Sequence, residues 1–376
     1  MSMFGLQHGF HGFHGFHGFH GFHGFDRGGQ DGPDLSGLQS STQALVHAAG
    51  FDPLPPEGVN ALAADTAGLM RRWAPNVREL LLQSIFSKGL GWSEDADSVS
   101  INWAETVIWQ VNRPSATTVA TQCGLVRAYI DQRPDRSREI LSQLGSFGAY
   151  FGIILGLSGA RNAKTYELLD IVQGLAGLAA MMPKHMLACR RPDEIDGRIL
   201  PLIPTPGHGS FPSAHAAQAF AMATVLDSLV RSVPGHFADA DVRIDLLYRQ
   251  AHRIAVNRTV AGVHFPMDSH AGALLGLQIG RALVGLLAGQ TRLRPVQSFD
   301  PNQAAGADFL YKAFAETAID PANTPAADIA PDPLFAWYWA QAQAEFGGLV
   351  PPVPAPQTDP DPDQETAVEA LAMAAV

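Results

Sequence analysis

The sequence predicts an all-α fold, and two observations carry this prediction. Apolar residues recur at helical spacing in seven separate segments, whereas clear runs of alternating apolar and polar residues are nearly absent. With 376 residues, 46% of them hydrophobic and only 16% charged, the chain can bury a sizeable core. The predicted helical segments are 69–86, 119–130, 140–155, 166–187, 216–230, 244–256 and 271–287.

Both ends of the chain have low complexity and are predicted to lie outside the folded domain. The tract from 8 to 25 repeats the triplet His-Gly-Phe six times, and so much Gly with nothing to pack on predicts a disordered tail over residues 1–34. Metal capture by the repeated histidines is the alternative to a tail without a role. Residues 347–376 begin with a Pro-rich, acidic stretch that predicts an extended tail, so the helical domain is expected over residues 35–346.

The longest uncharged run, 140–160, is just long enough to span a bilayer. It contains five Gly together with Ser and Gln, and no other segment matches it, so we predict a buried core helix or a pair of helices. The N-terminus has no charged segment followed by an apolar run, which predicts no signal peptide. These observations predict a cytoplasmic or otherwise soluble protein for which a membrane is an unlikely partner.

The net charge of −11 argues against a general role in nucleic-acid binding, because a surface that follows phosphates needs a basic excess. Any site for an anion must therefore be a local cluster of positive charge. The two cysteines, Cys123 and Cys189, lie far apart and match no spacing typical of metal ligands.

The first candidate cluster, "KHMLACRRP", lies at the end of the segment 166–187. Lys184 is followed seven residues later by Arg191, and Pro192 is expected to end the helix there. A planar Arg side chain can bind two oxygens of an anion, and Lys supplies a point charge. The alternative is a basic helix end that only interacts favourably with the helix dipole.

The second cluster, "PSAH", precedes the segment 216–230. Pro212 disfavours helix at the residue before it, and Ser213 is a natural N-cap. The free N–H groups of the first turn then form an anion site, with His215 beside it. The alternative is an ordinary capped helix with an exposed His.

The third cluster, "NRTVAGVHFPMD", combines a cation with an imidazole and a carboxylate. His264 and Asp268 are four residues apart, so on a helix they share one face. The carboxylate can hold one ring nitrogen, which leaves the other as a nucleophile. Arg258 lies six residues earlier, across Gly262, which allows a bend. The alternative is a common surface pair of His and Asp.

Together these clusters read K-x6-R-P, P-S-x-H and R-x5-H-x3-D. In this order they resemble the signature of the superfamily that joins type 2 phosphatidic acid phosphatases (PAP2), bacterial class A acid phosphatases and vanadium-dependent haloperoxidases. The resemblance covers about residues 135–290, with the motifs at 184–268, and implies a helical bundle with the oxyanion site in its core. Ala214 stands in place of the usual Gly, and Asn257 in place of the usual Ser.

The resemblance also implies how the oxyanion is bound. Lys184, Arg191 and Arg258 would neutralise its nonbridging oxygens. The hydroxyl of Ser213 and the backbone N–H of Ala214 would donate hydrogen bonds to it.

The same resemblance assigns the reacting groups. His264 would attack phosphorus in a phosphatase or act as the metal ligand to vanadium in a haloperoxidase, and Asp268 would orient it. His215 would be the general acid or base. His208 lies seven residues before His215, where bromoperoxidases of this superfamily resemble it in carrying a His.

We expect the haloperoxidase branch, with vanadate (orthovanadate) as cofactor, and with hydrogen peroxide and a halide, bromide favoured, as substrates. The long Pro/Gly loop of residues 201–216, His208 and the long N-terminal half favour it. The alternative is a soluble acid phosphatase that acts on a phosphate ester through a phosphohistidine at His264 and needs no cofactor. A membrane lipid phosphatase and a non-enzymatic metal- or phosphate-binding protein also stay open, and the sequence predicts no oligomeric state.

Overall fold

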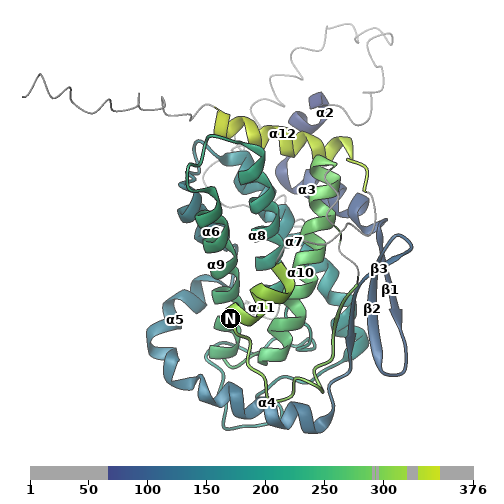
Figure 1. Ribbon diagram of the computed structural model, residues 1–376, viewed down its shortest axis with the longest axis vertical. Coiled ribbons are helices and arrows are strands. Elements are labelled where there is room, and N and C mark those ends of the chain that lie inside the picture. The colour runs from purple at the N-terminus through teal and green to yellow at the C-terminus, as the bar shows by residue number, and fades with distance from the viewer. Residues whose placement is uncertain (1–66, 290–292, 294–295, 320–328, 348–376) are drawn as a thin grey trace, which may run out of the picture.

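The computed structural model describes residues 67–289, 293, 296–319 and 329–347 of the chain (Figure 1). The predicted tail over residues 1–34 lies outside this range, as does the predicted tail over residues 347–376 apart from its first residue. The limits of the predicted domain, 35–346, therefore stay predictions.

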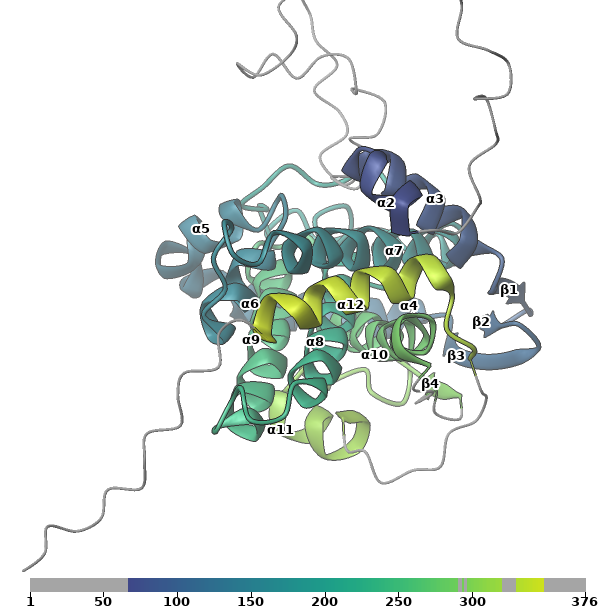
Figure 2. The same ribbon diagram turned by 90° about the horizontal axis from the view of Figure 1, so that it is seen from above.

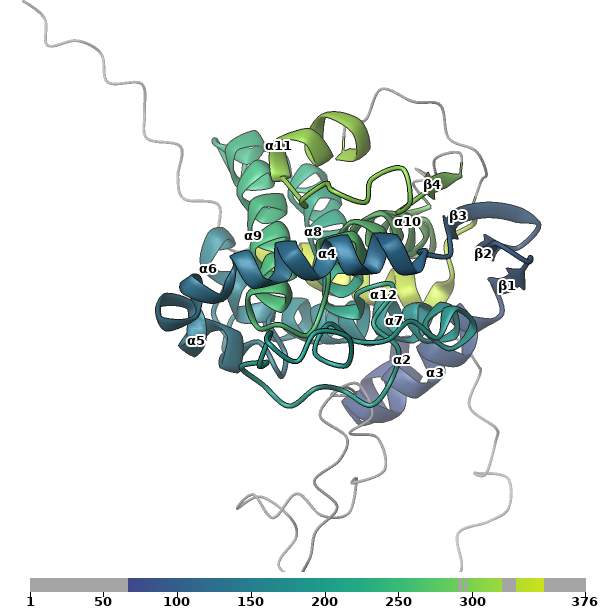
Figure 3. The same ribbon diagram turned by 90° about the horizontal axis from the view of Figure 1, so that it is seen from below.

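The described part of the chain is mostly helical, as predicted. Four long helices, α7 (Ala163–Leu187), α8 (Ala214–Ser232), α9 (Ala240–Val260) and α10 (Pro266–Ala288), lie side by side with the short α6 (Gly148–Leu155) next to α9. Figure 2 shows α12 (Pro333–Gly347) crossing one end of these helices. Figure 3 shows α4 (Ala116–Ala128) and α5 (Arg133–Ser142) crossing the other end, joined by the single turn η3 (Ile130–Gln132).

Helix α10 packs against α7, α8, α9 and α12, and nearly all of its residues are buried. Every fourth residue on its face toward α8 is Gly: a Cβ at Gly272 or Gly276 would overlap the carbonyl oxygen of Ser213 or Ala217, and one at Gly280 would overlap Thr224. These glycines let two helix backbones approach more closely than side chains would allow.

Two of the predicted helices are interrupted in the structure. The segment 69–86 forms α2 (Ala67–Arg72) and α3 (Pro75–Ser87), because Pro75 disfavours helix at the residue before it and begins a new helix. The segment 140–155 joins the end of α5 to α6, so the second of the two predicted alternatives, a pair of helices, is the one observed. Ile153 on α6 is 81% exposed, which shows that this pair is not a fully buried core.

The prediction of an all-α fold was wrong in one respect, because four strands form a sheet beside α7 and α10. Strands β1 (Leu90–Glu94), β2 (Ser98–Trp103) and β3 (Thr106–Asn112) are antiparallel, and β4 (Gln297–Phe299) pairs parallel to β3. Apolar residues do alternate along β2, at Val99, Ile101 and Trp103, but three positions make too short a pattern to stand out beside long helical repeats.

Side chains from the sheet and from α4 fix the position of α10. The indole of Trp109 on β3 donates to the carbonyl of Ala271 over 3.0 Å, and the amide oxygen of Gln122 on α4 accepts from the backbone N–H of Met267 over 3.1 Å. The second contact satisfies one of the free N–H groups in the first turn of α10.

The C-terminal elements cover the remaining surfaces of this group of helices. The short α11 (Tyr311–Phe314) and η4 (Ala315–Ile319) bring Phe314 against Phe220 of α8. Helix α12 is held by the hydroxyl of Tyr338, which contacts both Arg78 of α3 and Glu167 of α7.

Gly276→Val should destabilise the protein, because the new side chain cannot fit against the carbonyl of Ala217 without moving α8. Overpacking of this kind costs about 1–3 kcal/mol of unfolding free energy. Urea denaturation followed by circular dichroism measures it. Gly124→Ala on α4 is the control, since a Cβ there meets nothing within 4 Å and Ala favours helix. Equal unfolding free energies for the two variants would contradict the close packing of α8 on α10.

Candidate active site

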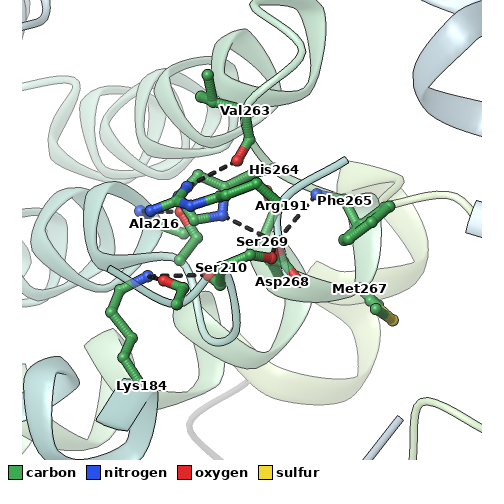
Figure 4. Close-up of polar contacts among 12 residues, drawn as sticks. Lys184, Arg191, Ser210, Ala216, Val263, His264, Phe265, Met267, Asp268 and Ser269 are labelled. Atoms are coloured by element: carbon green, nitrogen blue, oxygen red, sulfur yellow. Dashed lines mark hydrogen bonds and ion pairs between the residues drawn. The ribbon is translucent and has the colours of Figure 1, made fainter. Parts of the chain in front are cut away.

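The predicted site residues meet where one end of each long helix converges. Lys184 lies in the last turn of α7 and Arg258 in the last turn of α9, while Ser213 caps the start of α8 and Asp268 lies in the first turn of α10. His264 precedes α10. The loop 188–213 between α7 and α8 closes the site with Arg191 and His208, and Figure 4 shows part of this cluster.

His264 and Asp268 form the centre of the cluster. Nδ1 of His264 lies 2.8 Å from Oδ2 of Asp268, and the two side chains are 5% and 0% exposed. The spacing of His264 and Asp268 predicts that both lie on one helix, but α10 begins at Pro266 and His264 lies just before it. The chain turns at Gly262, whose φ of 85° suits Gly, and this turn brings His264 back toward the first turn of α10.

Asp268 is held by donors on several sides. Its Oδ2 accepts from the hydroxyl of Ser210 over 2.5 Å and from the backbone N–H of Phe265 over 3.0 Å, in addition to His264. Burial raises the pKa of Asp268 to about 6, while these hydrogen bonds and the nearby cations oppose the rise. The carboxylate is therefore ionised at neutral pH and fixes the N–H of His264 on Nδ1.

Arg191 contacts the other ring nitrogen of His264. Its Nη1 lies 3.0 Å from Nε2 of His264 and 2.7 Å from the carbonyl of Val263, and its Nε donates to the carbonyl of His208 (Figure 4). Arginine only donates, so Nε2 of His264 accepts and carries a lone pair. Burial and then Arg191 and Lys184 lower the pKa of His264 well below its ordinary value, which keeps the imidazole neutral.

Lys184 is 1% exposed and holds the loop before α8. Its Nζ donates to the carbonyls of Gly209 and Ser210 over 2.9 and 2.8 Å, which uses two of its three donors. Burial, with a further contribution from Arg191, lowers the pKa of Lys184 well below its usual range. No carboxylate pairs directly with this ammonium among the contacts of the described residues.

The start of α8 has the geometry of an anion site. Ser213 caps the helix, and its hydroxyl accepts from the backbone N–H of Ala216 over 3.3 Å. Its own backbone N–H donates to the carbonyl of Asp268 over 2.9 Å, which joins the start of α8 to the start of α10. Ala214 follows in the first turn and is partly exposed, and its N–H is one of the groups at a helix start that have no intrahelical partner.

Arg258 is 1% exposed and only partly satisfied. Its Nη2 donates to the carbonyl of Ile140 and to the amide oxygen of Gln143, whereas Nε and Nη1 are buried without a partner. Buried guanidinium donors are rarely left unpaired, so the two free N–H groups indicate the place of an anionic ligand. Burial lowers the pKa of Arg258 to about 10, so it stays charged at neutral pH.

His215 and His208 are both partly exposed, and each contacts other groups of the site. Nε2 of His215 lies 3.1 Å from the carbonyl of Gln143, and its ring stacks on Phe147. Burial and Arg258 lower the pKa of His215 well below its ordinary value. Nδ1 of His208 lies 3.1 Å from Nη2 of Arg191, and burial, followed by Lys184 and Arg191, lowers the pKa of His208 to about 4.

The charges of this site do not balance. Three buried basic side chains face one buried carboxylate, which is a formal excess of two positive charges when Lys184 is protonated. The half-buried Glu139 behind Arg258 is itself paired with Arg253, so it compensates little of this excess. Such a site suits a bound dianion of tetrahedral shape, whose oxygens can reach several cations at once.

The structure brings all nine predicted residues into this one region, and it adds three that the sequence analysis missed. Ser210 supports Asp268, while Gln143 and Asn257 lie behind Arg258, where Nδ2 of Asn257 donates to the amide oxygen of Gln143. Ser210 lies inside a Gly/Pro-rich loop, and Gln143 lies far from every motif, so spacing alone carried no signal for either. Asn257 was noticed only as a departure from the expected Ser.

Two relatives from Mycobacterium tuberculosis, in the strains CDC 1551 / Oshkosh and ATCC 25618 / H37Rv, are decaprenylphosphoryl-5-phosphoribose phosphatases. Each is 27% identical over 146 residues, which is 38% of this chain and 75% of the relative. A solved structure, the transmembrane PAP2 type phosphatidylglycerolphosphate phosphatase from Bacillus subtilis, matches with 20% identity and a TM-score of 0.39 over 58% of this chain and 98% of the other.

The predicted haloperoxidase activity was wrong, because the relatives that match are phosphatases. Vanadate as cofactor, with His264 as its metal ligand, loses its support with that activity, as do peroxide and halide as substrates. The alternative in the same analysis, a phosphatase that needs no cofactor, agrees with these relatives.

The expectations of a cytoplasmic or soluble protein and of an unlikely membrane partner were also wrong. The relatives are named for a decaprenyl-linked substrate. In the part of the chain that the structure describes, α10 is the one helix long and apolar enough to cross a membrane, although 94% of its most apolar window is buried inside the protein.

The family itself is the one that the motifs indicated. Residues 168–292 match the model of the PAP2 superfamily, and this range holds every predicted site residue from Lys184 to Asp268. Through this region the chain is similar to the PAP2 superfamily.

Proposed function

We propose that this protein is a phosphatase that hydrolyses phosphate monoesters through a phosphohistidine at His264. The observation that carries the proposal is the neutral His264, oriented by Asp268, beside three buried cations with two positive charges in excess. A phosphate monoester dianion supplies the missing charge. Simple anion capture would need the cations but not an oriented imidazole nucleophile.

In this proposal the phosphoryl group lies between the cations and the start of α8. Arg258 uses its free Nε and Nη1, and Lys184 its third N–H. The backbone N–H of Ala214 and the hydroxyl of Ser213 donate from the helix start. In the structure, Nη1 of Arg191 contacts Nε2 of His264. When this nitrogen attacks phosphorus, Nη1 donates its hydrogen bond to a phosphoryl oxygen instead. Fixed donors of this kind stabilise the charge of the transition state.

The reaction runs in two steps. Nε2 of His264 attacks phosphorus, the ester P–O bond breaks, and protonated His215 gives its proton to the leaving oxygen. Water then attacks phosphorus, His215 takes the proton of that water, and the P–N bond breaks to release inorganic phosphate and restore His264. Asp268 accepts the N–H of Nδ1 throughout, which stabilises the positive charge on the ring in the intermediate.

His215 becomes a proton donor only when the substrate is bound. The empty site disfavours protonated His215, because burial and Arg258 both lower its pKa. A bound dianion places two negative charges beside the ring and raises that pKa. His208 neighbours Arg191 at the opening, where it is positioned to contact the substrate beyond the phosphoryl group.

A lipid-linked phosphate monoester is the favoured substrate class, because the matched relatives are named for one. The test compares the purified protein on a decaprenyl-linked sugar phosphate and on a water-soluble aryl phosphate, with release of inorganic phosphate as the readout. Hydrolysis of neither substrate would overturn the proposed function.

His264→Asn should abolish phosphate release and the covalent intermediate together, because Asn keeps a polar side chain but no nucleophilic ring nitrogen. Acid quenching of the wild type during turnover of a radiolabelled substrate should trap an acid-labile phosphoprotein, which the variant lacks. His236→Asn, at a histidine outside the site, is the control. A variant that retains labelling would show that another residue is phosphorylated.

His215→Asn should lower kcat by about 10²–10⁴-fold, as expected for the loss of a general acid. Inorganic phosphate, titrated calorimetrically, should bind the variant within a few-fold of the wild type, because the three cations remain. If the variant no longer binds phosphate, His215 shapes the anion site instead of transferring a proton.

The pH dependence of kcat/KM should be bell-shaped, with its maximum on the acid side of pH 7. Activity is lost as pH falls because Asp268, whose pKa is about 6, gains a proton and no longer orients His264. It is lost as pH rises because His215, whose pKa is lowered in the free enzyme, loses its proton. The profile is measured as initial rates on an aryl phosphate. The second pKa of its phosphate group should lie below the tested pH range, so that the substrate stays a dianion throughout. A maximum above pH 8 would contradict these roles.

A further inference from the structure

Gln143 contacts two of the site residues from outside the signature motifs. It caps the C-terminal end of α5, is 0% exposed, and precedes the residues 168–292 that match the superfamily. Its side chain reaches Arg258, and its main chain reaches His215. These two residues come from different helices, α9 and α8, so Gln143 links them through a third element.

The side-chain amide of Gln143 can adopt only one orientation. Its Oε1 accepts from Nη2 of Arg258 and from Nδ2 of Asn257, both over 3.0 Å, and its Nε2 donates to Oε1 of Glu139 over 3.2 Å. Reversal of the amide would place its NH₂ group against two other donors and its oxygen against a carboxylate. Glu139 also accepts from Asn257 over 2.8 Å, so the surrounding network is itself fixed.

The main chain at this helix end contacts both Arg258 and His215. The carbonyl of Gln143 lies 3.1 Å from Nε2 of His215, and the carbonyl of Ile140 accepts from Nη2 of Arg258 over 3.3 Å. The last carbonyls of a helix lack intrahelical partners and carry partial negative charge, which favours cations beside them. Since a carbonyl only accepts, Nε2 of His215 carries the hydrogen, and Nδ1 is the nitrogen that can exchange a proton with a ligand.

We propose that Gln143 is a positioning residue, which fixes Arg258 through its side chain and His215 through its carbonyl so that both address the phosphoryl group. The proposal rests on the proposed function. Because Nη2 of Arg258 donates to Gln143 and to the carbonyl of Ile140, Nε and Nη1 stay available for the phosphoryl oxygens. Holding Nε2 of His215 leaves Nδ1 for the leaving oxygen.

The test replaces the side chain but keeps the carbonyl. Gln143→Met has a similar volume and removes the acceptor for Arg258, so the dissociation constant of inorganic phosphate and KM should rise by about 10-fold or more. The alkaline limb of the kcat/KM profile should not move, because the contact with His215 is made by the main chain. Gln278→Met, at an equally buried glutamine in the middle of α10, is the matched control and should leave both constants unchanged.

A double-mutant cycle separates positioning from general damage. Once Arg258→Met has removed the guanidinium, adding Gln143→Met should weaken phosphate binding by less than about 2-fold, because the two side chains act as one unit. If Gln143→Met does not fold, Gln143→Glu replaces it in the cycle. This variant keeps an acceptor for Arg258 but adds a negative charge, and it should weaken phosphate binding increasingly as pH rises and the new carboxylate ionises.

The outcomes distinguish this inference from the proposed function. A wild type that binds phosphate but hydrolyses no monoester would overturn the function, and phosphate binding by the variants would still test Gln143. Unchanged phosphate affinity in Gln143→Met, or additive effects with Arg258→Met, would overturn the positioning role even if the wild type is an active phosphatase.

Discussion

The site depends on one electrostatic constraint, the burial of three cations against a single carboxylate. Lys184, Arg191 and Arg258 are almost completely shielded from water, and burying a charge costs several kcal/mol unless other groups compensate it. The protein compensates part of this cost with neutral oxygens: carbonyls at Gly209, Ser210, Val263 and His208 surround two of the cations. In the proposed function, the uncompensated remainder attracts the dianionic substrate.

The same constraint explains why His264 is available as a nucleophile. Cations near an imidazole disfavour its protonation, so the positive charges that we propose bind the phosphoryl group also keep His264 neutral. Asp268 would normally reverse this effect, but it is shared with Ser210 and with the backbone of Phe265. Asp268 therefore orients the ring of His264 without making it a cation. In the proposed function, phosphoryl binding and the attack by His264 thus depend on the same arrangement of charges.

The sequence predicted the helices well because they have local signals, and signals of the same kind led to the candidate site residues. The four long helices carry helical periodicity over many turns, and the motifs place cations and histidines at fixed spacings from the helix ends. The hairpin of β2 and β3 was missed because its alternation is short. The break between α5 and α6 was only one of two predicted alternatives, because no Pro marks its position. Gln143 could not be predicted, since its contacts depend on how the end of α5 folds against α8 and α9. The choice between the haloperoxidase and phosphatase branches could not be made either, because the motif residues are common to both.

The glycines of α10 have a consequence for the geometry of the reaction. Gly272 packs against the carbonyl of Ser213, and the N–H of Ser213 donates to the carbonyl of Asp268, so the two helix starts touch through main-chain atoms. The distance between the start of α8 and the pair of His264 and Asp268 is thus set by two backbones in contact and does not depend on side-chain rotamers. In the proposed phosphatase, the reacting distance would then stay constant, and leaving groups of different shape would be accommodated by the loop around His208 and the turn after α5.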